Sequence, residues 1–376
     1  MNSVSAAPPR GRAGPAPHQR APLAGARAAL FRRHLLQVMA VVVTLCGSVV
    51  LLNLFVDPLW YWHGNQITGR NFPFNERLAR VNLLLQDPAH YDCLLFGSSR
   101  VGLFDQSRIE NHRCFNVTFS SGSIVEFLDY AGYLVDLGVQ PELVIVGVDD
   151  YNFLPELKQP PATPDFVRRH EPPPSALLSY LSLGATRLSL LTLLQQSDES
   201  RYYDERIVGH VLESAPQFVP PETLPAPAKS STFDPHRAAL YGRLRGYFPD
   251  AAFWGYVPPI SAWDVAGERY AAGFLDAYLE AIAATAAYFD EFYDFSVPSP
   301  MTERTDNSYD GSHYFPWVNA IIAERLQAGG TAVPPDGFGL PVHALTPQAY
   351  RAAYMARFRH FLAAEFPAAP VAARRP

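Results

Sequence analysis

The 376-residue chain is poor in cysteine and in charged residues. Its three cysteines are too few for a disulfide-dense mini-protein, and none forms the CxxC spacing of a zinc site. No HExxH motif occurs and no second histidine lies at ligand spacing from His313, so the sequence favours no metal or other cofactor. Charged residues make up 18% of the chain and hydrophobic residues 48%. This balance excludes a disordered or coiled-coil protein and provides for a large core.

Acidic residues are absent from the first 56 positions, which hold six arginines. The rest of the chain carries all 36 acidic residues against 24 basic ones, so its net charge is −12. An acidic body with one basic end is unlike a nucleic-acid-binding protein, which presents a basic face to its partner. The asymmetry indicates a membrane topology instead, and we expect no nucleic-acid partner.

Residues 35–56 form a run of 22 residues without a charge. As a helix this run is about 33 Å long, enough to span the hydrocarbon core of a bilayer. A basic cluster at residues 32–34 precedes it and an aromatic cluster at residues 60–62 follows it. The positive-inside rule therefore places the N-terminus in the cytoplasm. Residues 1–34, rich in alanine, proline, glycine and arginine, are predicted to form a disordered cytoplasmic tail.

A cleaved signal peptide is the alternative to a retained anchor. The apolar run exceeds the usual 7–15 residues, and no A-x-A-like cleavage site follows it. A lipoprotein anchor at Cys46 is disfavoured because Leu45 stands where such sites need a small residue. We therefore expect a single-pass membrane protein. Two lysines against 28 arginines, with abundant alanine and proline, indicate a high-GC bacterial gene, and hence the inner membrane with the main domain in the periplasm.

Short apolar runs alternate with helical patterns over the main domain, residues 57–366. Strands are expected at residues 93–96, 114–118, 143–148, 252–257 and 291–297, and helices at 75–85, 124–137, 177–196, 265–288, 315–326 and 348–366. This order predicts right-handed βαβ crossovers and a parallel sheet with helices on both faces. Pro-rich stretches within about residues 155–240 are predicted to be insertions, and residues 367–376 a tail.

The first candidate motif is Gly97-Ser98-Ser99-Arg100, directly after an expected strand. The carboxyl ends of parallel strands open onto the ligand crevice of an α/β sheet. A serine at the N-terminus of a following helix has backbone N–H groups and a positive dipole beside it, which stabilise an oxyanion. The alternative is that Ser98 and Ser99 only cap that helix.

The second candidate motif is the sequence DGSH at residues 310–313. A serine hydroxyl becomes a nucleophile when an imidazole accepts its proton and a carboxylate holds that imidazole. Asp310 and His313, three residues apart at a loop–helix junction, can face the same crevice. The alternative is a helix cap beside a surface histidine. Gly122, after the second strand, either offers a backbone N–H to an oxyanion or only forms a tight turn.

The order of these motifs resembles the SGNH (GDSL-like) hydrolase superfamily over about residues 90–327. The likeness is greatest to its membrane-anchored bacterial branch, near DltD and the alginate-type O-acetylation proteins, in which GSS can replace GDS. The resemblance implies a three-layer α/β/α fold with a parallel five-stranded sheet. It further implies that Ser99 is the nucleophile, His313 the base and Asp310 the residue that orients it, while the Ser99 and Gly122 amides hold the oxyanion.

The third motif departs from the G-x-N-D of that superfamily, because the chain has Gly147-Val148-Asp149-Asp150. The asparagine of the family pattern donates to the oxyanion, whereas a carboxylate at Asp149 repels it unless protonated. Loss of one such donor costs roughly 2.7–4 kcal/mol. A slower enzyme, another donor and a pseudo-enzyme all remain open.

The family's strand order, 2-1-3-4-5, makes the first two strands neighbours. The resemblance therefore allows Cys93 and Cys114, which open these strands, to form a disulfide outside the cytoplasm. Two buried free cysteines are the alternative. In either case the pair lies at the opposite end of the strands from the site.

We expect a membrane-anchored acyltransferase or esterase that acts on O-acyl groups, above all O-acetyl groups, of a cell-envelope polysaccharide. A multi-pass membrane protein is the expected acyl donor if the reaction is a transfer. The alternative is a catalytically degenerate protein of the same fold that binds glycan or partner proteins in envelope assembly. Hydrogen-bond reach between Ser99 Oγ and the His313 ring favours the enzyme, and a separation well over roughly 6 Å favours the alternative.

Overall fold

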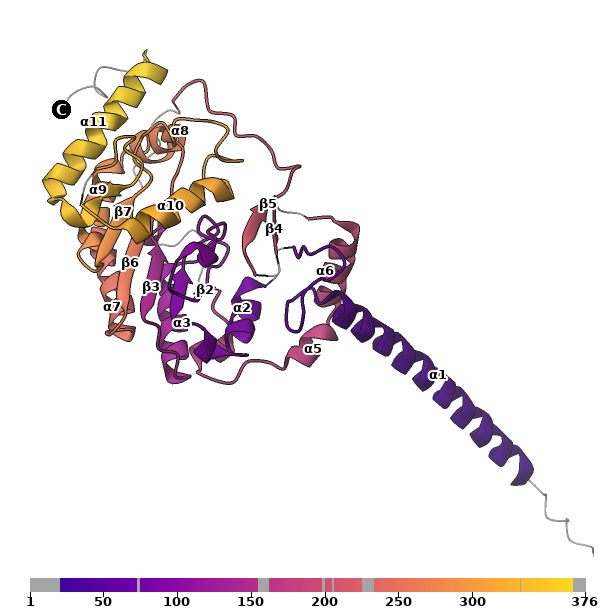
Figure 1. Ribbon diagram of the computed structural model, residues 1–376. Helices are drawn as coiled ribbons and strands as arrows, with labels where there is room; N and C mark the ends of the chain where they lie inside the picture. Colours follow the sequence, from indigo (N-terminus) through magenta and orange to yellow (C-terminus); the bar gives the residue numbers. More distant parts are fainter. Residues whose placement is uncertain are drawn as a thin grey trace, which may run out of the picture. The chain divides into compact units, whose positions relative to one another are not determined.

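A mixed, mostly parallel sheet of six strands forms the centre of the domain, in the order β2-β1-β3-β6-β7-β8 (Figure 1). The computed structural model describes residues 21–72, 75–154, 162–197, 200–204, 206–224, 233–331 and 333–367. The strands are β1 (Cys93–Phe96), β2 (Cys114–Asn116), β3 (Leu143–Gly147), β6 (Ala252–Val257), β7 (Glu291–Asp294) and β8 (Leu340–Pro341). The first five pair in parallel, and β8 pairs antiparallel with β7.

The expectation of a wholly parallel five-stranded sheet is therefore wrong by one strand. The five expected strands are all present, and β1 and β6 have the expected bounds. The sixth, β8, contains just two residues, and Leu340 pairs with Asp294. A strand of two residues has no periodic pattern, so the sequence gives no signal for it.

Alternate residues of the central strands face two different cores, as the pleat of a strand requires. Leu94 and Phe96 of β1 belong to one core cluster, and Cys93 and Leu95 belong to the other. Both faces are buried, so the strand sequence is apolar throughout. The first cluster is completed by α3 (Ile124–Asp136), α7 (Ala239–Tyr247), α9 (Leu275–Ala286) and α11 (Pro347–Glu365), and the second by α10 (Pro316–Ala328).

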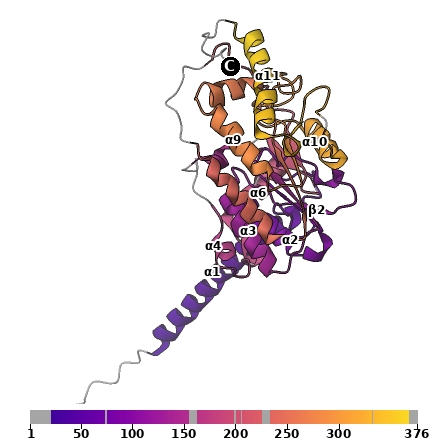
Figure 2. The same ribbon diagram turned by 90° about the vertical axis from the view of Figure 1, so that its left-hand side faces the viewer.

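Two of the expected helices are interrupted. The helix expected at 177–196 is a pair, α5 (Ala176–Tyr180) and α6 (Leu183–Leu194), because Ser182 N-caps α6 through its hydroxyl. The helix expected at 265–288 is also divided. Residues 265–270 form a π-helical turn directly after α8 (Ala262–Asp264), and α9 begins only after Gly273. The last helix, α11, packs along α9 (Figure 2).

The insertion region contributes elements that its Pro-rich sequence does not indicate. Strands β4 (Arg201–Tyr203) and β5 (Gly209–Val211) form an antiparallel hairpin. Helix α4 (Asp165–Arg168) precedes α5, and α2 (Glu76–Leu84) supports the hairpin from the start of the domain. The parts of the expected insertion at residues 155–161 and 225–232 lie outside the described residues.

The N-terminal helix α1 (Ala21–Val56) has the length and composition of a membrane anchor or a signal sequence over Arg27–Val56. Its part up to Leu51 is a unit of its own, and the domain begins at Leu52. Residues 21–34, which the sequence assigned to a tail, are helical, whereas residues 1–20 and most of the expected C-terminal tail lie outside the described residues.

Cys93 and Cys114 are joined in a disulfide between β1 and β2. They are direct partners in the parallel register, with their Cα atoms 4.2 Å apart. Disulfides persist in oxidising compartments. Together with the long apolar helix, the bond indicates a membrane-anchored or secreted extracytoplasmic domain.

Candidate active site

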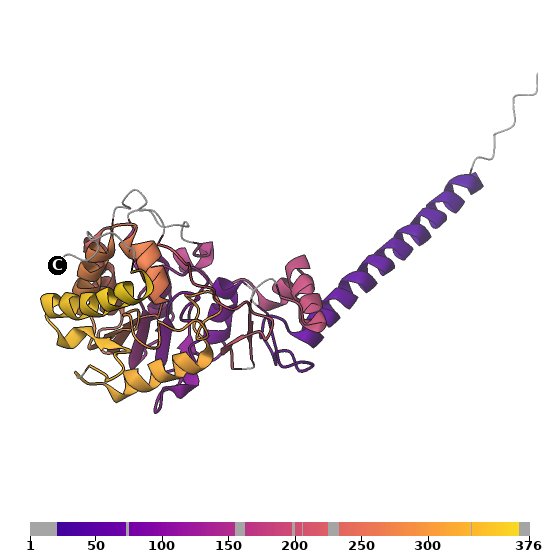
Figure 3. The same ribbon diagram turned by 90° about the horizontal axis from the view of Figure 1, so that it is seen from above.

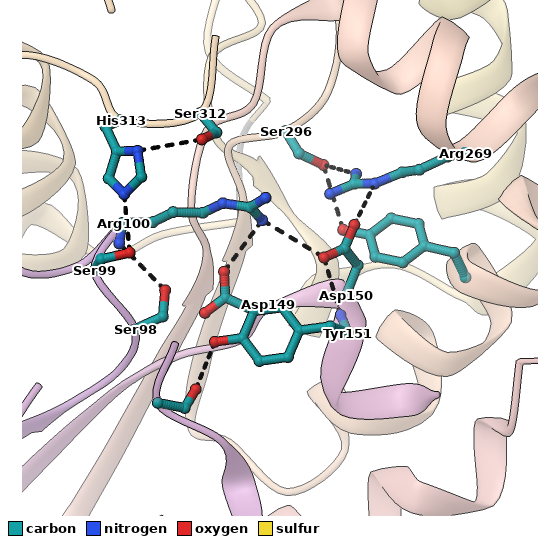
Figure 4. A network of polar contacts seen from close by, with 12 residues as sticks. Ser98, Ser99, Arg100, Asp149, Asp150, Tyr151, Arg269, Ser296, Ser312 and His313 are labelled. Atoms are coloured by element: carbon teal, nitrogen blue, oxygen red, sulfur yellow. Dashed lines mark hydrogen bonds and ion pairs between the residues drawn. The ribbon is translucent and has the colours of Figure 1, made fainter. Parts of the chain in front are cut away.

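Ser99, His313 and Asp310 lie in one chain of hydrogen bonds. The Nε2 atom of His313 is 2.8 Å from Ser99 Oγ, and its Nδ1 atom is 2.7 Å from Asp310 Oδ2 (Figure 4 shows the first contact). A neutral imidazole has one donor nitrogen and one acceptor nitrogen. The carboxylate can only accept, so the proton is assigned to Nδ1, and Nε2 is then free to accept the serine proton. The structure thus brings Ser99 together with two residues that lie more than 200 positions later in the sequence.

The loop that carries Ser99 leaves β1 as a tight turn rather than as the start of a helix. The N–H groups of Val101 and Gly102 both donate to the carbonyl of Ser98, so they are used within the turn. A Cβ atom at Gly97 or Gly147 would overlap the side chain of Val101, which fills this space. Residues 99–103 form turns, so the expected helix after the motif is wrong.

The loop that carries the other two residues is held by the carboxylate of Asp310. Its Oδ1 atom accepts the backbone N–H groups of Ser312 at 2.9 Å and His313 at 2.7 Å. Gly311, the residue after Asp310, has a φ of +84°, and a Cβ atom there would overlap Oδ2 of Asp264. Only glycine meets both conditions without strain. The DGSH sequence thus forms a turn that fixes Asp310 against the imidazole.

The imidazole is further fixed by an aromatic neighbour and a hydroxyl. Tyr309 stacks on His313 with ring centroids 5.3 Å apart and planes 8° from parallel. Ser312 Oγ lies 3.3 Å from Nδ1. Partial burial acts to raise the pKa of Asp310, but the hydrogen bond and charge of His313 outweigh it and lower that pKa to about 2. Asp310 therefore stays ionised at any physiological pH.

Of the two backbone N–H groups expected to bind an oxyanion, those of Ser99 and Gly122, only one is free to do so. The Ser99 N–H donates to no acceptor among the residues described, which leaves it available. The Gly122 N–H donates to the Phe119 carbonyl at 2.8 Å, so it is already used in a turn. Asn152, two residues past the third motif, is fully buried; its Oδ1 accepts the N–H of Ile124 at 2.9 Å, and its Nδ2 has no hydrogen-bond partner among the described residues. One expected donor is thus free and one is occupied.

Asp149 lies behind the loop that carries Ser99 and is almost fully buried, with 1% of its surface exposed. Its Oδ1 atom is 3.2 Å from Nη1 of Arg100, while its Oδ2 atom has no hydrogen-bond partner in the described part of the chain (Figure 4). Burial raises the pKa of this carboxyl, against the opposing charge of Arg100. Position 149, where the G-x-N-D pattern has an asparagine, therefore has a buried carboxyl with one of its two oxygens hydrogen-bonded.

A charged network that the motif comparison missed surrounds this carboxyl. The Arg100 guanidinium lies between Asp149 and Asp150, 3.5 Å from the latter, and Nε of the fully buried Arg269 is 3.1 Å from Asp150 on the other side (Figure 4). Burial opposes the charge of Arg100, but the two carboxylates raise the pKa of its guanidinium above the usual range. Arg100 and Asp150 belong to the first and third motifs, although their pairing could not be read from the sequence, whereas Arg269 lies in no motif.

Arg201 is a second residue that sequence reasoning missed. It belongs to the hairpin of the insertion region and is 4% exposed. Its Nη1 atom is 3.4 Å from the Ser99 carbonyl oxygen, and its Nη2 atom is 3.1 Å from Ser120 Oγ. The hairpin also abuts the turn, because a Cβ atom at Gly209 would overlap the Gly102 carbonyl. The hairpin of the insertion therefore contacts and fixes the backbone of the loop that carries Ser99.

Asp264 is a further carboxyl beside the DGSH turn. Burial raises its pKa to about 6, and Asp310 adds to this effect by charge repulsion. Its backbone N–H donates to Ser261 Oγ at 3.1 Å. Among the described residues, no group of three His, Cys, Asp or Glu side chains could hold a metal ion. The chemistry that these side chains can perform is proton transfer and nucleophilic attack by a serine.

No protein-family model, curated protein or solved structure matches this chain. What the site can do is therefore argued from its own geometry.

Proposed function

We propose that this protein is a membrane-anchored acyltransferase or esterase of the SGNH type that acts on O-acyl groups, above all acetyl, of a cell-envelope polysaccharide. The observation that carries the proposal is the hydrogen-bonded chain from Ser99 through His313 to Asp310. A serine, an imidazole and a carboxylate in this order, within hydrogen-bond reach, are the parts that acyl transfer needs. The distance of 2.8 Å favours the enzyme over a non-catalytic protein.

In the proposed reaction, Ser99 Oγ attacks the acyl carbonyl while its proton passes to Nε2 of His313. Asp310 stabilises the resulting imidazolium and holds the ring. The Ser99 N–H faces the oxyanion, and His313 then returns the proton to the departing alcohol. The acyl-serine that remains is attacked by water in an esterase or by a sugar hydroxyl in a transferase, and His313 takes the proton of the attacking group. Every proton is accounted for by one imidazole.

The proposed setting is the bacterial inner membrane, with the N-terminus in the cytoplasm and the domain in the periplasm. The uncharged run, the basic residues before it and the disulfide in the domain support this topology. A multi-pass membrane protein is the proposed acyl donor if the reaction is a transfer. The sheet with helical cores on both faces agrees with the three-layer arrangement of the SGNH superfamily.

The test is turnover of 4-nitrophenyl acetate by the full-length protein in detergent, with and without an oligosaccharide acceptor. We expect nitrophenol release from the wild type and from Ser98→Ala, a neighbouring serine outside the hydrogen-bonded chain, but only background release from Ser99→Ala. Mass spectrometry of the acceptor separates transfer from hydrolysis. Equal release by Ser99→Ala and the wild type would contradict the proposal.

A catalytically degenerate glycan- or protein-binding protein is the second candidate. The observations that favour it are the carboxyl at Asp149 and the occupied N–H of Gly122, which together leave the oxyanion with one backbone donor. Under this alternative, a folded wild type binds envelope glycan without turning over any ester, and the Ser99→Ala variant binds it equally well.

A further inference from the structure

Helix α6 is apolar on its outside and polar on its inside. Ser189 and Thr192 are buried, whereas Leu183 is 86% and Leu194 64% exposed. A helix of a water-soluble protein has the opposite arrangement, with its apolar stripe toward the core. Helices in a bilayer are instead joined by small and hydroxyl-bearing residues and present their apolar side chains to lipid. The pattern of α6 is therefore that of a helix in contact with lipid.

Exposed leucines lie on both α6 and α5, two helices that contact each other, and make up an apolar surface of this part of the domain. We call this surface the leucine patch; its members are Leu177, Leu178, Leu181, Leu183, Leu190, Leu193 and Leu194. Large exposed apolar side chains gathered on neighbouring helices of a folded protein mark a site of interaction with a partner or a membrane. Arg187 is the sole charged residue within the α6 sequence.

The polar inner face of α6 contacts Asn53 in the last turn of the N-terminal helix, which belongs to the domain. Asn53 donates from Nδ2 to the Tyr180 carbonyl at 2.8 Å and to Thr186 Oγ1 at 3.1 Å, and its Oδ1 accepts the hydroxyl of Ser189 at 2.8 Å. Asn53 itself is fully buried. Figures 1 and 3 show α5 and α6 beside this end of α1. The position of the leucine patch is thus fixed relative to Leu52–Val56, which belong to the domain.

This attachment sets the depth of the patch. Asn53 is three residues before Val56, the last residue of the uncharged run, a rise of about 4.5 Å. Asp57, the first charge after the run, accepts the N–H groups of Tyr61, Trp62 and His63 and the hydroxyl of Tyr180. The end of the span and α5 are therefore joined at the level where hydrocarbon gives way to headgroups.

An aromatic side chain marks the same level. Trp62 is half-exposed and contacts the Tyr180 ring edge-to-face, with centroids 4.5 Å apart. Tryptophan and tyrosine are enriched at membrane–water interfaces, where their apolar rings and polar edges meet both phases. The aromatic pair, the leucine patch and the end of the span thus lie together.

We propose that α5 and α6 lie in the outer leaflet of the bilayer that α1 crosses, with the leucine patch against the acyl chains. The proposal rests on α1 being a retained anchor, as in the proposed function. Lipid is the occupant that the structure favours, because the patch adjoins the exit point of the span, where lipid surrounds the chain. The domain is then held to the membrane by two elements, and its orientation above the surface is restricted.

The test uses the full-length protein in phosphatidylcholine–phosphatidylglycerol vesicles, with an environment-sensitive fluorophore on a single cysteine. Native Cys46, the one free cysteine among the described residues, reports on the anchor. In a Cys46→Ser background, Leu183→Cys and Leu194→Cys report on the patch. Leu137→Cys, at an exposed leucine that ends α3, is the matched control. None of the four substituted side chains is buried in the domain, so the fold should be retained, which melting curves check.

An interfacial helix buries its apolar face about 5–10 Å into the headgroup–acyl boundary, so nitroxide lipids labelled near the headgroup should quench the probes at 183 and 194 by about half or more. The probe at 137 should not be quenched, and the probe at 46 should respond to lipids labelled deeper in the chain. Quenching at 46 without quenching at 183 and 194 overturns the proposal and leaves the anchor intact. No quenching at any position overturns both.

A fourth outcome is a blue-shifted but unquenched probe at 183 and 194. It means that protein, such as a second copy of this chain, covers the leucine patch, and it also overturns the proposal.

Discussion

The guanidinium of Arg100 donates a hydrogen bond to the buried carboxyl of Asp149, with Nη1 3.2 Å from Oδ1, behind the loop that carries Ser99. In the proposed SGNH-type site this position would hold an oxyanion donor, and the contact with Arg100 explains how a carboxyl can be buried there. Arg100 compensates the charge, and burial raises the pKa of the carboxyl at the same time. In the proposed mechanism, the site therefore has its three reacting side chains but lacks one donor to the oxyanion.

Asp149→Asn should supply the missing oxyanion donor. The amide replaces a repelling carboxylate by an N–H donor, and one donor in an oxyanion site is worth about 10²–10³ in kcat. We expect kcat for 4-nitrophenyl acetate to rise about tenfold or more at neutral pH, since the new amide is not optimally placed. Asp150→Asn, which removes the other carboxylate of Arg100, is the control and should not increase kcat. A fall of Asp149→Asn to background would show that the carboxyl is required.

Asp310→Asn should lower kcat by about 10³–10⁴, because the amide no longer favours the productive tautomer of His313 or stabilises its positive form. KM should change little, since Asp310 is placed away from the substrate. Asp306→Asn, an exposed carboxylate paired with Arg304, is the matched control and should retain full activity. Comparable kcat values for the two variants would remove Asp310 from the mechanism.

The disulfide should stabilise the domain without affecting catalysis. It closes a loop with a sequence separation of 21, and the chain-entropy relation gives about 3 kcal/mol for a loop of this size. The double variant Cys93→Ala, Cys114→Ala should melt at a lower temperature than the wild type, and reductant should lower only the wild-type value. Cys46→Ser should leave melting unchanged. The double variant should keep its kcat at 25 °C, because the cysteines open their strands and the site lies at the opposite ends.

Asp264→Asn should stabilise the protein in a pH-dependent way. The pKa of Asp264 is about 6 in the folded protein against 3.8 for an ordinary aspartate, so ionisation costs more in the folded state. Below pH 3.8 both states hold the proton and the cost is absent. It grows as the pH rises through the folded pKa and is complete above pH 7, where it amounts to at most about 3 kcal/mol.

Melting curves at pH 4 and pH 7.5 check this prediction. The difference between Asp264→Asn and the wild type should be small at pH 4 and large at pH 7.5. The exposed Asp250→Asn should show no such change. A stabilisation that is greatest at pH 4 would contradict the assignment.

Much of the sheet could be predicted from the sequence, because buried parallel strands such as Leu143–Gly147 are uninterrupted apolar runs between turn residues. Ser99, Asp310 and His313 could be selected as candidates that lie together, since each belongs to a short motif at the end of an element. The geometry that joins them required the structure, because it depends on packing between segments more than 200 residues apart.

Residues without a local signal could not be predicted. Arg201 reaches Ser99 from a strand of three residues in a Pro-rich region, and Arg269 reaches Asp150 from a π-helical turn. The helix expected after Ser99 was wrong because Val101 fills the space between Gly97 and Gly147. In each case a tertiary contact, which no window of sequence contains, decides the local structure.

The central claim is that Ser99 is a nucleophile activated by His313, and covalent capture tests it most directly. The full-length protein is treated with a fluorophosphonate probe, which reacts with activated serines, and the adduct is located by peptide mass spectrometry. We predict a single adduct on the peptide that contains Ser99, retained in Ser98→Ala and lost in Ser99→Ala and His313→Ala. Undiminished labelling of Ser99→Ala, or no labelling of the folded wild type, would contradict the account.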